Sequence, residues 1–356
     1  MIKLGGQKSI QPKIKTYPSY GFRPGNGDWL VNVFGHVYQT LALNLRQKML
    51  LKMLGNVMKA SKEELQSSTF KNRVNPFFVE PLWRQEIQLE LGGKTFVLAK
   101  KSRRNGQFNS WVRLENRLIQ QLAQQNGERK TLNISVSTGH PATEPVDCYI
   151  ELLENQGLSV ISDIDDTIKE SNVRDRRELL MNTFVRDYRC VEGMSDVYRQ
   201  WSEAEVDFHY VSSSPWQLLE SLQKMKSEFQ FPEGSMHLRN FRLRDQFLRK
   251  LMFRRKGKAT EIKKLIKNLP QRKFILVGDS GEKDPEIYSK ICRKFPSQVK
   301  GVFIRDLGRR ELLNERLKKI HRMTPLETCA AFATSDELQQ LSKPLVQRYG
   351  RSLAAK

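Results

Sequence analysis

The sequence predicts an α/β fold, with a doubly wound parallel sheet preceded by a β-rich, sandwich-like N-terminal domain. From residue 157 onward, short apolar runs that end in small or acidic residues alternate with segments of helical periodicity, which is typical of a parallel sheet with covering helices. Before that residue, apolar and polar positions alternate and a glycine pair marks a turn, which favours strands. The 356 residues are enough for two domains with a core each.

The first domain is expected over 28–155, after a loose basic leader over 1–27 that is rich in Lys, Pro and Gly. Its clearest element is a hairpin, because two alternating runs flank a Gly-Gly pair. The elements expected in this domain are strands at 29–37, 131–138 and 146–153, the hairpin at 85–100, and an amphipathic helix at 40–65.

The second domain is expected over 156–320, followed by a helical C-terminal tail over 321–356. In doubly wound sheets, ligands bind beyond the carboxyl ends of the strands, and this is where the apolar runs place their polar residues. The elements expected here are strands at 158–163, 206–213, 273–279 and 299–306, with helices at 216–229 and 257–268 between them.

The net charge of +22 indicates an anionic partner, and nucleic acid, an acidic membrane surface and a phosphorylated substrate all fit it. No stretch approaches the ~20 apolar residues of a membrane-spanning helix, and the N-terminus lacks the apolar core of a signal peptide. We therefore expect a cytoplasmic location, either free or peripheral at membranes. The four cysteines are far apart in the sequence, which argues against a zinc site or a disulfide framework.

Residues with catalytic chemistry gather at the ends of the predicted strands. The first strand runs into "DIDDTIK", and carboxylates this close raise one another's pKa unless a cation lies among them. A later strand runs into "GDSGEKDPEIY", which supplies further carboxylates. The candidates are Asp163, Asp165 and Thr167 after the first strand, Ser212, Ser213 and Ser214 after the second, Lys258 at a helix start, and Asp279 and Asp284 around the third.

These residue types suit the transfer of a phosphoryl group to a carboxylate. Mg²⁺ held by Asp163, Asp279 and a backbone carbonyl would mask the charges of the nucleophile and the phosphate. Asp163 would form an aspartyl-phosphate intermediate, and Asp165 would act as general acid and then general base. Ser212 and Lys258 would stabilise the transferring oxygens. Three further roles complete the prediction. Asp165 and Asp284 are also candidate metal ligands, Ser213 is a candidate phosphate-binding residue, and Thr167 is a candidate catalytic residue.

The motifs in this order resemble those of the haloacid dehalogenase superfamily of phosphohydrolases. The phrases "VISDIDDTIK", "YVSSSPWQL" and "LVGDSGEKDPEIY" resemble more narrowly the catalytic domain of the actin-patch type of Mg²⁺-dependent phosphatidate phosphatases, over roughly 157–306. The resemblance implies a Rossmannoid sheet and hydrolysis of phosphatidate to diacylglycerol and phosphate. It assigns Asp163 as nucleophile, Asp165 as acid and base, and Asp279 as metal ligand, with Asp284 supporting the waters of the metal.

The sequence departs from the family pattern at the active-site lysine. Family members have His before this lysine, whereas Gly257 precedes Lys258 here, and Lys256 is also close. Simpler alternatives stay open for several candidates: Asp284 before a proline suits a turn, the serines suit a polar strand end, and Lys258 suits a solvated surface.

Two other functions stay open on the sequence. The same chemistry would serve a phosphatase that acts on a nucleic-acid terminal phosphate or on a soluble phosphomonoester. A non-enzymatic adaptor would instead bind anionic membranes through the basic, aromatic-rich stretch 239–256, which carries an amphipathic pattern from about residue 243. A helix packed on the core with a solvated basic face is the alternative for that stretch, and the oligomeric state is left open.

Overall fold

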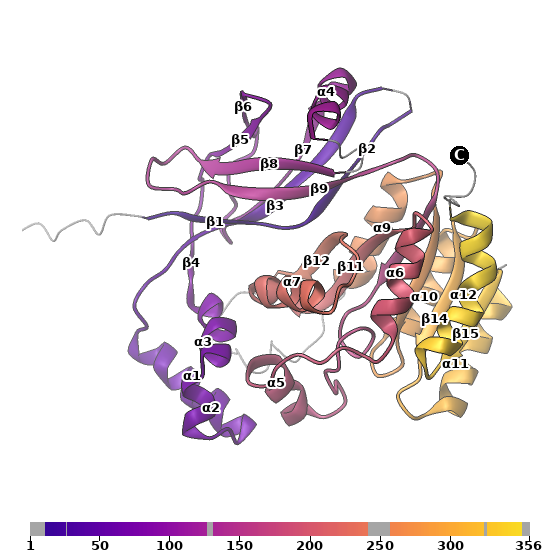
Figure 1. Cartoon of the computed structure of the whole chain (residues 1–356). Coiled ribbons are helices and arrows are strands. Elements are labelled where there is room, and N and C mark those ends of the chain that lie inside the picture. Colours follow the sequence, from indigo (N-terminus) through magenta and orange to yellow (C-terminus); the bar gives the residue numbers. More distant parts are fainter. Residues whose placement is uncertain (1–10, 26, 127–130, 241–256, 324–325, 351–356) are drawn as a thin grey trace, which may run out of the picture. The chain divides into compact units, whose positions relative to one another are not determined.

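The computed structural model describes residues 11–25, 27–126, 131–240, 257–323 and 326–350 (Figure 1). Contacts along the chain divide it into two units. The first unit takes residues 1–21, 26–44 and 78–152, and the second takes 22–25, 45–77 and 153–356. The chain crosses from the first unit to the second for the last time after residue 152, near residue 155, where we expect the first domain to end. The segments 22–25 and 45–77 differ from the prediction, because they group with the second unit.

The first unit is built on one nine-stranded sheet, and the predicted β-rich N-terminal region is confirmed. Buried and exposed positions alternate along the strand at 131–138, as expected for an antiparallel sheet that covers its core with one face. The order is β1-β3-β2-β9-β8-β5-β6, with β4 and β7 also paired to β3. The bounds are β1 (Lys13–Thr16), β2 (Ser19–Phe22), β3 (Trp29–Gln39), β4 (Glu80–Pro81), β5 (Ile87–Leu91), β6 (Lys94–Val97), β7 (Gln107–Leu114), β8 (Thr131–Thr138) and β9 (Val146–Leu153), with helix α4 at Asn116–Asn126.

Two N-terminal predictions are wrong. The part of the predicted loose leader that the structure describes contains β1 and β2, because Tyr17 and Tyr20 are buried and hold this segment in place. The single helix expected at 40–65 is interrupted: Lys59 has a positive φ, and Ser61 then caps a new helix in a capping box with Glu64. The helices observed are α1 (Leu45–Met58), α2 (Lys62–Gln66) and α3 (Ser68–Val74), followed by the 3₁₀ turn η1 (Asn75–Phe78).

The second unit is built on a six-stranded parallel sheet, which confirms the predicted doubly wound fold. All five residues of β10 are buried, as expected for a strand covered on both faces. Every neighbouring pair is parallel, in the order β12-β11-β10-β13-β14-β15. The bounds are β10 (Leu158–Ser162), β11 (Asp207–Pro215), β12 (Ser235–Arg239), β13 (Lys273–Asp279), β14 (Val299–Arg305) and β15 (Thr328–Phe332).

Helices cover this sheet in two rows. Helices α9, α10 and α11 contact one another in turn, and α6 contacts α12. None of the helices in the described residues is both long and apolar enough to cross a membrane. The helices are α5 (Arg176–Phe184), α6 (Met194–Glu203), α7 (Leu219–Glu228) after the 3₁₀ turn η2 (Trp216–Leu218), α9 (Gly257–Asn268), α10 (Asp284–Lys294), α11 (Arg310–Met323) and α12 (Ser335–Tyr349).

The C-terminal prediction needs a correction as well. The tail expected to be helical over 321–356 contributes β15, the edge strand of the sheet, before α12 begins. The strand "TCAAF" is short, and its first three residues are small and only partly buried, so it lacks the apolar run that marked the other strands.

The strand order places a switch point at the centre of the sheet. From β10 the chain moves outward to β11 and β12, and then returns to the other side of β10 with β13. Crossovers leave this point in opposite directions, which opens a crevice at the carboxyl ends of β10 and β13. The predicted carboxylates stand at these two strand ends.

We expect Arg272→Met to lower the free energy of unfolding by about 3–5 kcal/mol, because it leaves buried acceptors and a carboxylate without their partner. Arg272 is 1% exposed, forms an ion pair with Asp207, and donates to the carbonyl oxygens of Glu154 (2.7 Å) and Leu158 (2.9 Å) and to Ser159 Oγ (2.9 Å).

Chemical denaturation would measure this loss, with Arg199→Met as the matched control. Arg199 forms an exposed ion pair with Asp196, for which a loss below about 1 kcal/mol is expected. Equal losses in the free energy of unfolding for the two variants would show that the buried hydrogen bonds of Arg272 do not stabilise the fold.

Candidate active site

The predicted site residues meet at the carboxyl edge of the parallel sheet. Asp163 directly follows β10, and its backbone N–H donates to Val277 O of β13 at 2.9 Å. Asp279 is the last residue of β13, and Ser212 lies near the end of β11. Neighbouring parallel strands thus bring residues that are more than a hundred positions apart to one edge.

Three buried carboxylates form the centre of the site. One ligand oxygen each of Asp163, Asp279 and Asp284 lies within 4.8 Å of the others. Asp284 begins α10 and packs against the backbone of Gly278, which has no side chain in the way. Asp279 Oδ1 accepts the backbone N–H groups at 281 and 282, at 2.7 and 2.8 Å, which fixes the turn between strand and helix.

Lys258 is the cation of this centre. It is buried at the start of α9, with Nζ at 2.9 Å from Asp163 Oδ1 and 2.5 Å from Asp284 Oδ1. Burial alone would lower the pKa of Lys258, but the two carboxylates raise it well above its usual value, so the ammonium stays charged. The structure therefore brings Lys258 to the site, whereas Lys256 lies outside the described residues.

The centre holds more negative charge than Lys258 neutralises. Three carboxylates face one ammonium, and within the described part of the chain Asp163 Oδ2 and Asp279 Oδ2 are buried without a hydrogen-bond partner. Burial and the neighbouring carboxylates raise the pKa of Asp163 and bring the pKa of Asp279 to about 8. Buried carboxylate oxygens that need a positive charge are the donor set of a divalent cation such as Mg²⁺ or Ca²⁺. The residues present therefore fit a metal.

Asp165 lies beside this centre but has a different set of partners. Its Oδ1 is 2.8 Å from Lys169 Nζ and accepts from Ser171 Oγ at 2.7 Å, while Oδ2 accepts from Ser212 Oγ at 3.2 Å and Ser214 Oγ at 2.7 Å. Burial would raise the pKa of Asp165, but the ion pair with Lys169 and these hydrogen bonds hold it below its usual range. The carboxylate oxygens of Asp165 are occupied by a lysine and three hydroxyls, and Asp165 is not part of the carboxylate group of Asp163, Asp279 and Asp284, so its role as a metal ligand stays a prediction.

The third aspartate of the cluster, Asp166, shapes the following loop. Its carboxylate accepts the backbone N–H groups of Ser171, Asn172 and Val173 at 2.6–2.8 Å. Asp166 and Asn172 both have positive φ, a conformation that Asp and Asn tolerate better than most residues. The crowded aspartates thus have three separate tasks: one faces the carboxylate centre, one pairs with a lysine, and one folds the loop.

The remaining predicted residues are also close by. Thr167 is buried, and among the described residues its Oγ1 has no hydrogen-bond partner. Ser213 lines the neighbouring pocket, while the Ser212 hydroxyl accepts the backbone N–H of Ser214 at 2.9 Å. The serines therefore act differently: Ser212 and Ser214 hold Asp165, and Ser213 faces the space where a ligand would lie.

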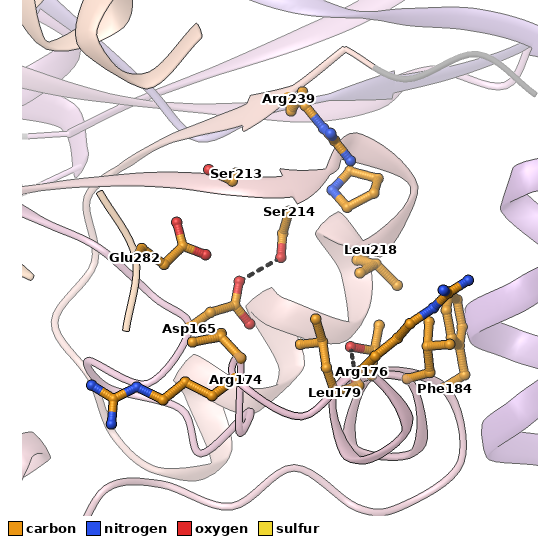
Figure 2. Close-up of a pocket in the computed structure, with 14 residues that line it drawn as sticks. Asp165, Arg174, Arg176, Leu179, Phe184, Ser213, Ser214, Leu218, Arg239 and Glu282 are labelled. Carbon is orange, nitrogen blue, oxygen red and sulfur yellow. Dashed lines mark hydrogen bonds between the residues drawn. The ribbon is translucent and has the colours of Figure 1, made fainter. Parts of the chain in front are cut away.

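A pocket of about 280 Å³ opens beside Asp165 (Figure 2). Leu179, Leu218 and Phe184 are grouped on one side of Asp165 in this view, and Glu282 lies on the other. Helix α5 supplies much of the apolar wall. The cationic residues that line the pocket are Arg174, Arg176 and Arg239.

Sequence reasoning missed Lys169, Ser171 and the wall from α5. The only available signal for Lys169 was its position four residues after Asp165 in "DDTIK". Nothing in the pattern marked α5 as a pocket wall. Of the basic stretch 239–256, for which membrane binding is one of the predicted alternatives, residues 241–256 lie outside the described residues.

Comparisons with known proteins agree with this geometry. Residues 158–306 match the sequence model of the family described as "Phosphatidate phosphatase APP1, catalytic domain". An uncharacterized protein of Schizosaccharomyces pombe is 34% identical over 162 residues, which cover 44% of this chain and 26% of that protein. Phosphatidate phosphatase APP1 of Saccharomyces cerevisiae is 38% identical over 154 residues, which cover 42% of this chain and 26% of that protein. The chain thus spans about a quarter of the length of these relatives.

Among solved structures, a HAD family hydrolase from Salmonella enterica is similar over 72% of this chain and 97% of its own, with 10% identity and a TM-score of 0.33. A similarity this weak carries no argument. The sequence matches alone confirm the predicted resemblance to the actin-patch type of phosphatidate phosphatase for residues 158–306.

Proposed function

We propose that this chain is a Mg²⁺-dependent phosphatase that hydrolyses phosphatidate to diacylglycerol and phosphate through an aspartyl-phosphate intermediate. The observation that carries the proposal is the buried group of Asp163, Asp279 and Asp284, whose unsatisfied oxygens lie beside Asp165 and an apolar-walled pocket. The match of residues 158–306 to phosphatidate phosphatase catalytic domains supports the choice of substrate.

The metal site in this proposal consists of Asp163 and Asp279, with Asp284 beside them. Mg²⁺ binds through few carboxylates and keeps places for water and for a substrate phosphate, which suits a site with two unsatisfied carboxylate oxygens. When bound, it would supply positive charge that lets a carboxylate approach a phosphate dianion. Lys258 holds Asp163 Oδ1, so Oδ2 is the oxygen left for chemistry or for the metal.

The chain's own residues carry out the two steps. A carboxylate oxygen of Asp163 attacks the phosphorus, and the bond from phosphorus to the glycerol oxygen breaks. Asp165 in its protonated form gives its proton to that oxygen, and as a carboxylate it then takes a proton from the water that cleaves the acyl phosphate. In the free protein, Lys169 favours the carboxylate form of Asp165. The negative charge of a bound phosphate favours the protonated form of Asp165, which is the form that the first step needs.

The pocket offers complementary surfaces for a lipid phosphate. Ser213 and the arginines that line it are donors for phosphate oxygens, and Arg groups bind phosphate in a bidentate manner. The wall of Leu179, Leu218 and Phe184 suits the apolar part of the substrate. With a membrane lipid as substrate, we place the protein in the cytoplasm and peripherally at membranes.

Mg²⁺-dependent phosphate release tests the proposal. Phosphatidate in detergent micelles would be compared with a 5′-phosphorylated oligonucleotide and a soluble monoester, with EDTA as the metal-free control. Release from phosphatidate that EDTA abolishes is the expected result. Preference for the oligonucleotide or the soluble monoester would overturn the substrate, and no release from any of them would overturn the enzymatic function.

We expect Gly278→Ala to weaken Mg²⁺ binding at least tenfold. An added Cβ would lie 2.3 Å from Asp284 Oδ2 and 2.9 Å from its Cβ, and Asp284 is fully buried, so the carboxylate must shift. Titration calorimetry with Mg²⁺ would measure the change. Gly257→Ala is the matched control, because no atom of the described residues lies within 4 Å of its added Cβ, although the residue adjoins Lys258. Unchanged binding in Gly278→Ala would show that Asp284 does not support the metal.

A further inference from the structure

We propose that helix α1 is a membrane-binding helix that lies on the surface of an anionic bilayer. Three large apolar side chains of this helix are exposed at a spacing of four residues: Leu45 (78%), Met49 (62%) and Met53 (51%). Residues four apart share one face of a helix, so these side chains form a continuous apolar stripe. Single exposed apolar residues are common, but an aligned stripe of this kind marks an interaction surface.

The opposite face of α1 already has its packing partners. Leu54, Gly55 and Met58 are buried, and the carbonyl oxygen of Met58 accepts from Arg177 Nε at 2.9 Å. Arg177 belongs to α5, and α1 contacts α5 within the second unit (Figure 1). The exposed stripe is therefore not needed to fold the helix onto the unit.

The charge of α1 selects the partner. Residues 45–58 contain Arg46, Lys48 and Lys52 and no acidic residue, and Lys48 and Lys52 are exposed. On a helical projection these two lysines flank the stripe on the side of Leu45. Cationic residues beside an apolar stripe are the pattern of helices that lie in the interface of anionic membranes, where each basic residue adds to the attraction.

The exposed stripe of α1 lies on a helix that is next to the wall of the pocket. Helix α5 packs against α1 and also supplies Leu179, Leu180 and Phe184 to the wall of the pocket beside Asp165. A bilayer seated on α1 would therefore lie one helix away from that pocket. Helix α1 is a different segment of the chain from the basic stretch 239–256. Vesicle binding by α1 requires no turnover, so this proposal can fail without the proposed activity failing, and the reverse.

Vesicle sedimentation tests the proposal on the full chain. Binding to vesicles of phosphatidylcholine with phosphatidylserine, which is not a monoester substrate, would be compared with binding to phosphatidylcholine alone. The first variant is Leu45→Gln/Met49→Gln/Met53→Gln, and the second is Lys48→Glu/Lys52→Glu. The matched controls are Leu312→Gln, an exposed apolar residue of α11, and Lys267→Glu/Lys290→Glu, two exposed lysines of α9 and α10. Circular dichroism would confirm that each variant is folded.

The wild-type chain should bind the anionic vesicles, and each α1 variant should lose about tenfold or more in affinity while both controls bind as the wild type does. Binding by the folded triple variant that equals the wild type would overturn the proposal, as would a wild type that ignores anionic vesicles. Self-association of the wild type that the triple variant loses, without vesicle binding, would assign the stripe to a second copy of the chain and overturn it too.

Discussion

Replacing Asp163 by Asn should lower kcat for phosphate release by about 10⁴-fold or more, which is the largest effect that we expect from any single change. The amide has almost the same shape but is not a nucleophile, so the covalent route through Asp163 closes. The same change removes the negative charge that pairs with Lys258 at 2.9 Å, which also weakens the metal site. A loss of this size is beyond what a change in substrate binding alone would cause.

The measurement is steady-state release from phosphatidate with saturating Mg²⁺. Asp196→Asn is the matched control, because Asp196 is an exposed aspartate of α6 with an ion pair of its own and should leave kcat unchanged. Unfolding by denaturant would show that Asp163→Asn is folded. A kcat within tenfold of the wild type would exclude Asp163 as the nucleophile.

The second large effect concerns metal and pH together. In the metal-free protein, burial first and neighbouring carboxylates second raise the pKa of Asp279 to about 8, against about 4 in an unfolded chain. Between these values the folded state holds a proton that the unfolded state has lost, so the metal-free protein loses stability as pH rises from about 4 to 8. Bound Mg²⁺ replaces that proton, so this loss disappears.

The stabilisation by Mg²⁺ should therefore grow with pH and level off above about 8. At a free Mg²⁺ concentration of about a hundred times its Kd, the gain in the free energy of unfolding should be about 3 kcal/mol. Thermal unfolding in EDTA and in Mg²⁺ from pH 5.5 to 8.5 measures it. Asp279→Asn should remove most of the gain and its pH dependence, and Asp196→Asn should keep both. A gain that is the same at every pH would contradict a metal held by Asp279.

The parts of the site that stand at strand ends could be predicted from the sequence. Asp163 and Asp279 directly follow apolar runs, and parallel strands bring their carboxyl ends to one edge regardless of the length of chain between them. The periodicity predicts Lys258 at a helix start, but the choice between it and Lys256 depends on the contacts of Lys258 with Asp163 and Asp284 in the structure. The doubly wound sheet itself follows from the alternation of such runs with helices, and the structure confirms it.

What could not be predicted depends on loops and on packing between distant segments. Lys169 reaches Asp165 because Asp166, with positive φ, turns the chain and gathers three backbone N–H groups, and no pattern in the sequence encodes that turn. The grouping of 45–77 with the second unit depends on contacts of α1 and α3 with α5, far away along the chain. Edge strand β15 lacks an apolar run, and its position depends on pairing with β14 and on packing against α11 and α12.

The most direct test of the central claim is a search for the phosphoryl group on Asp163 during turnover. The protein would be mixed with phosphatidate and Mg²⁺, quenched in acid within milliseconds, digested with pepsin and analysed by mass spectrometry. A phosphoryl group on the peptide that contains Asp163, absent in EDTA and in Asp163→Asn, is the predicted result. Turnover of phosphatidate with no covalent phosphoryl group, or with one on another residue, would contradict the account.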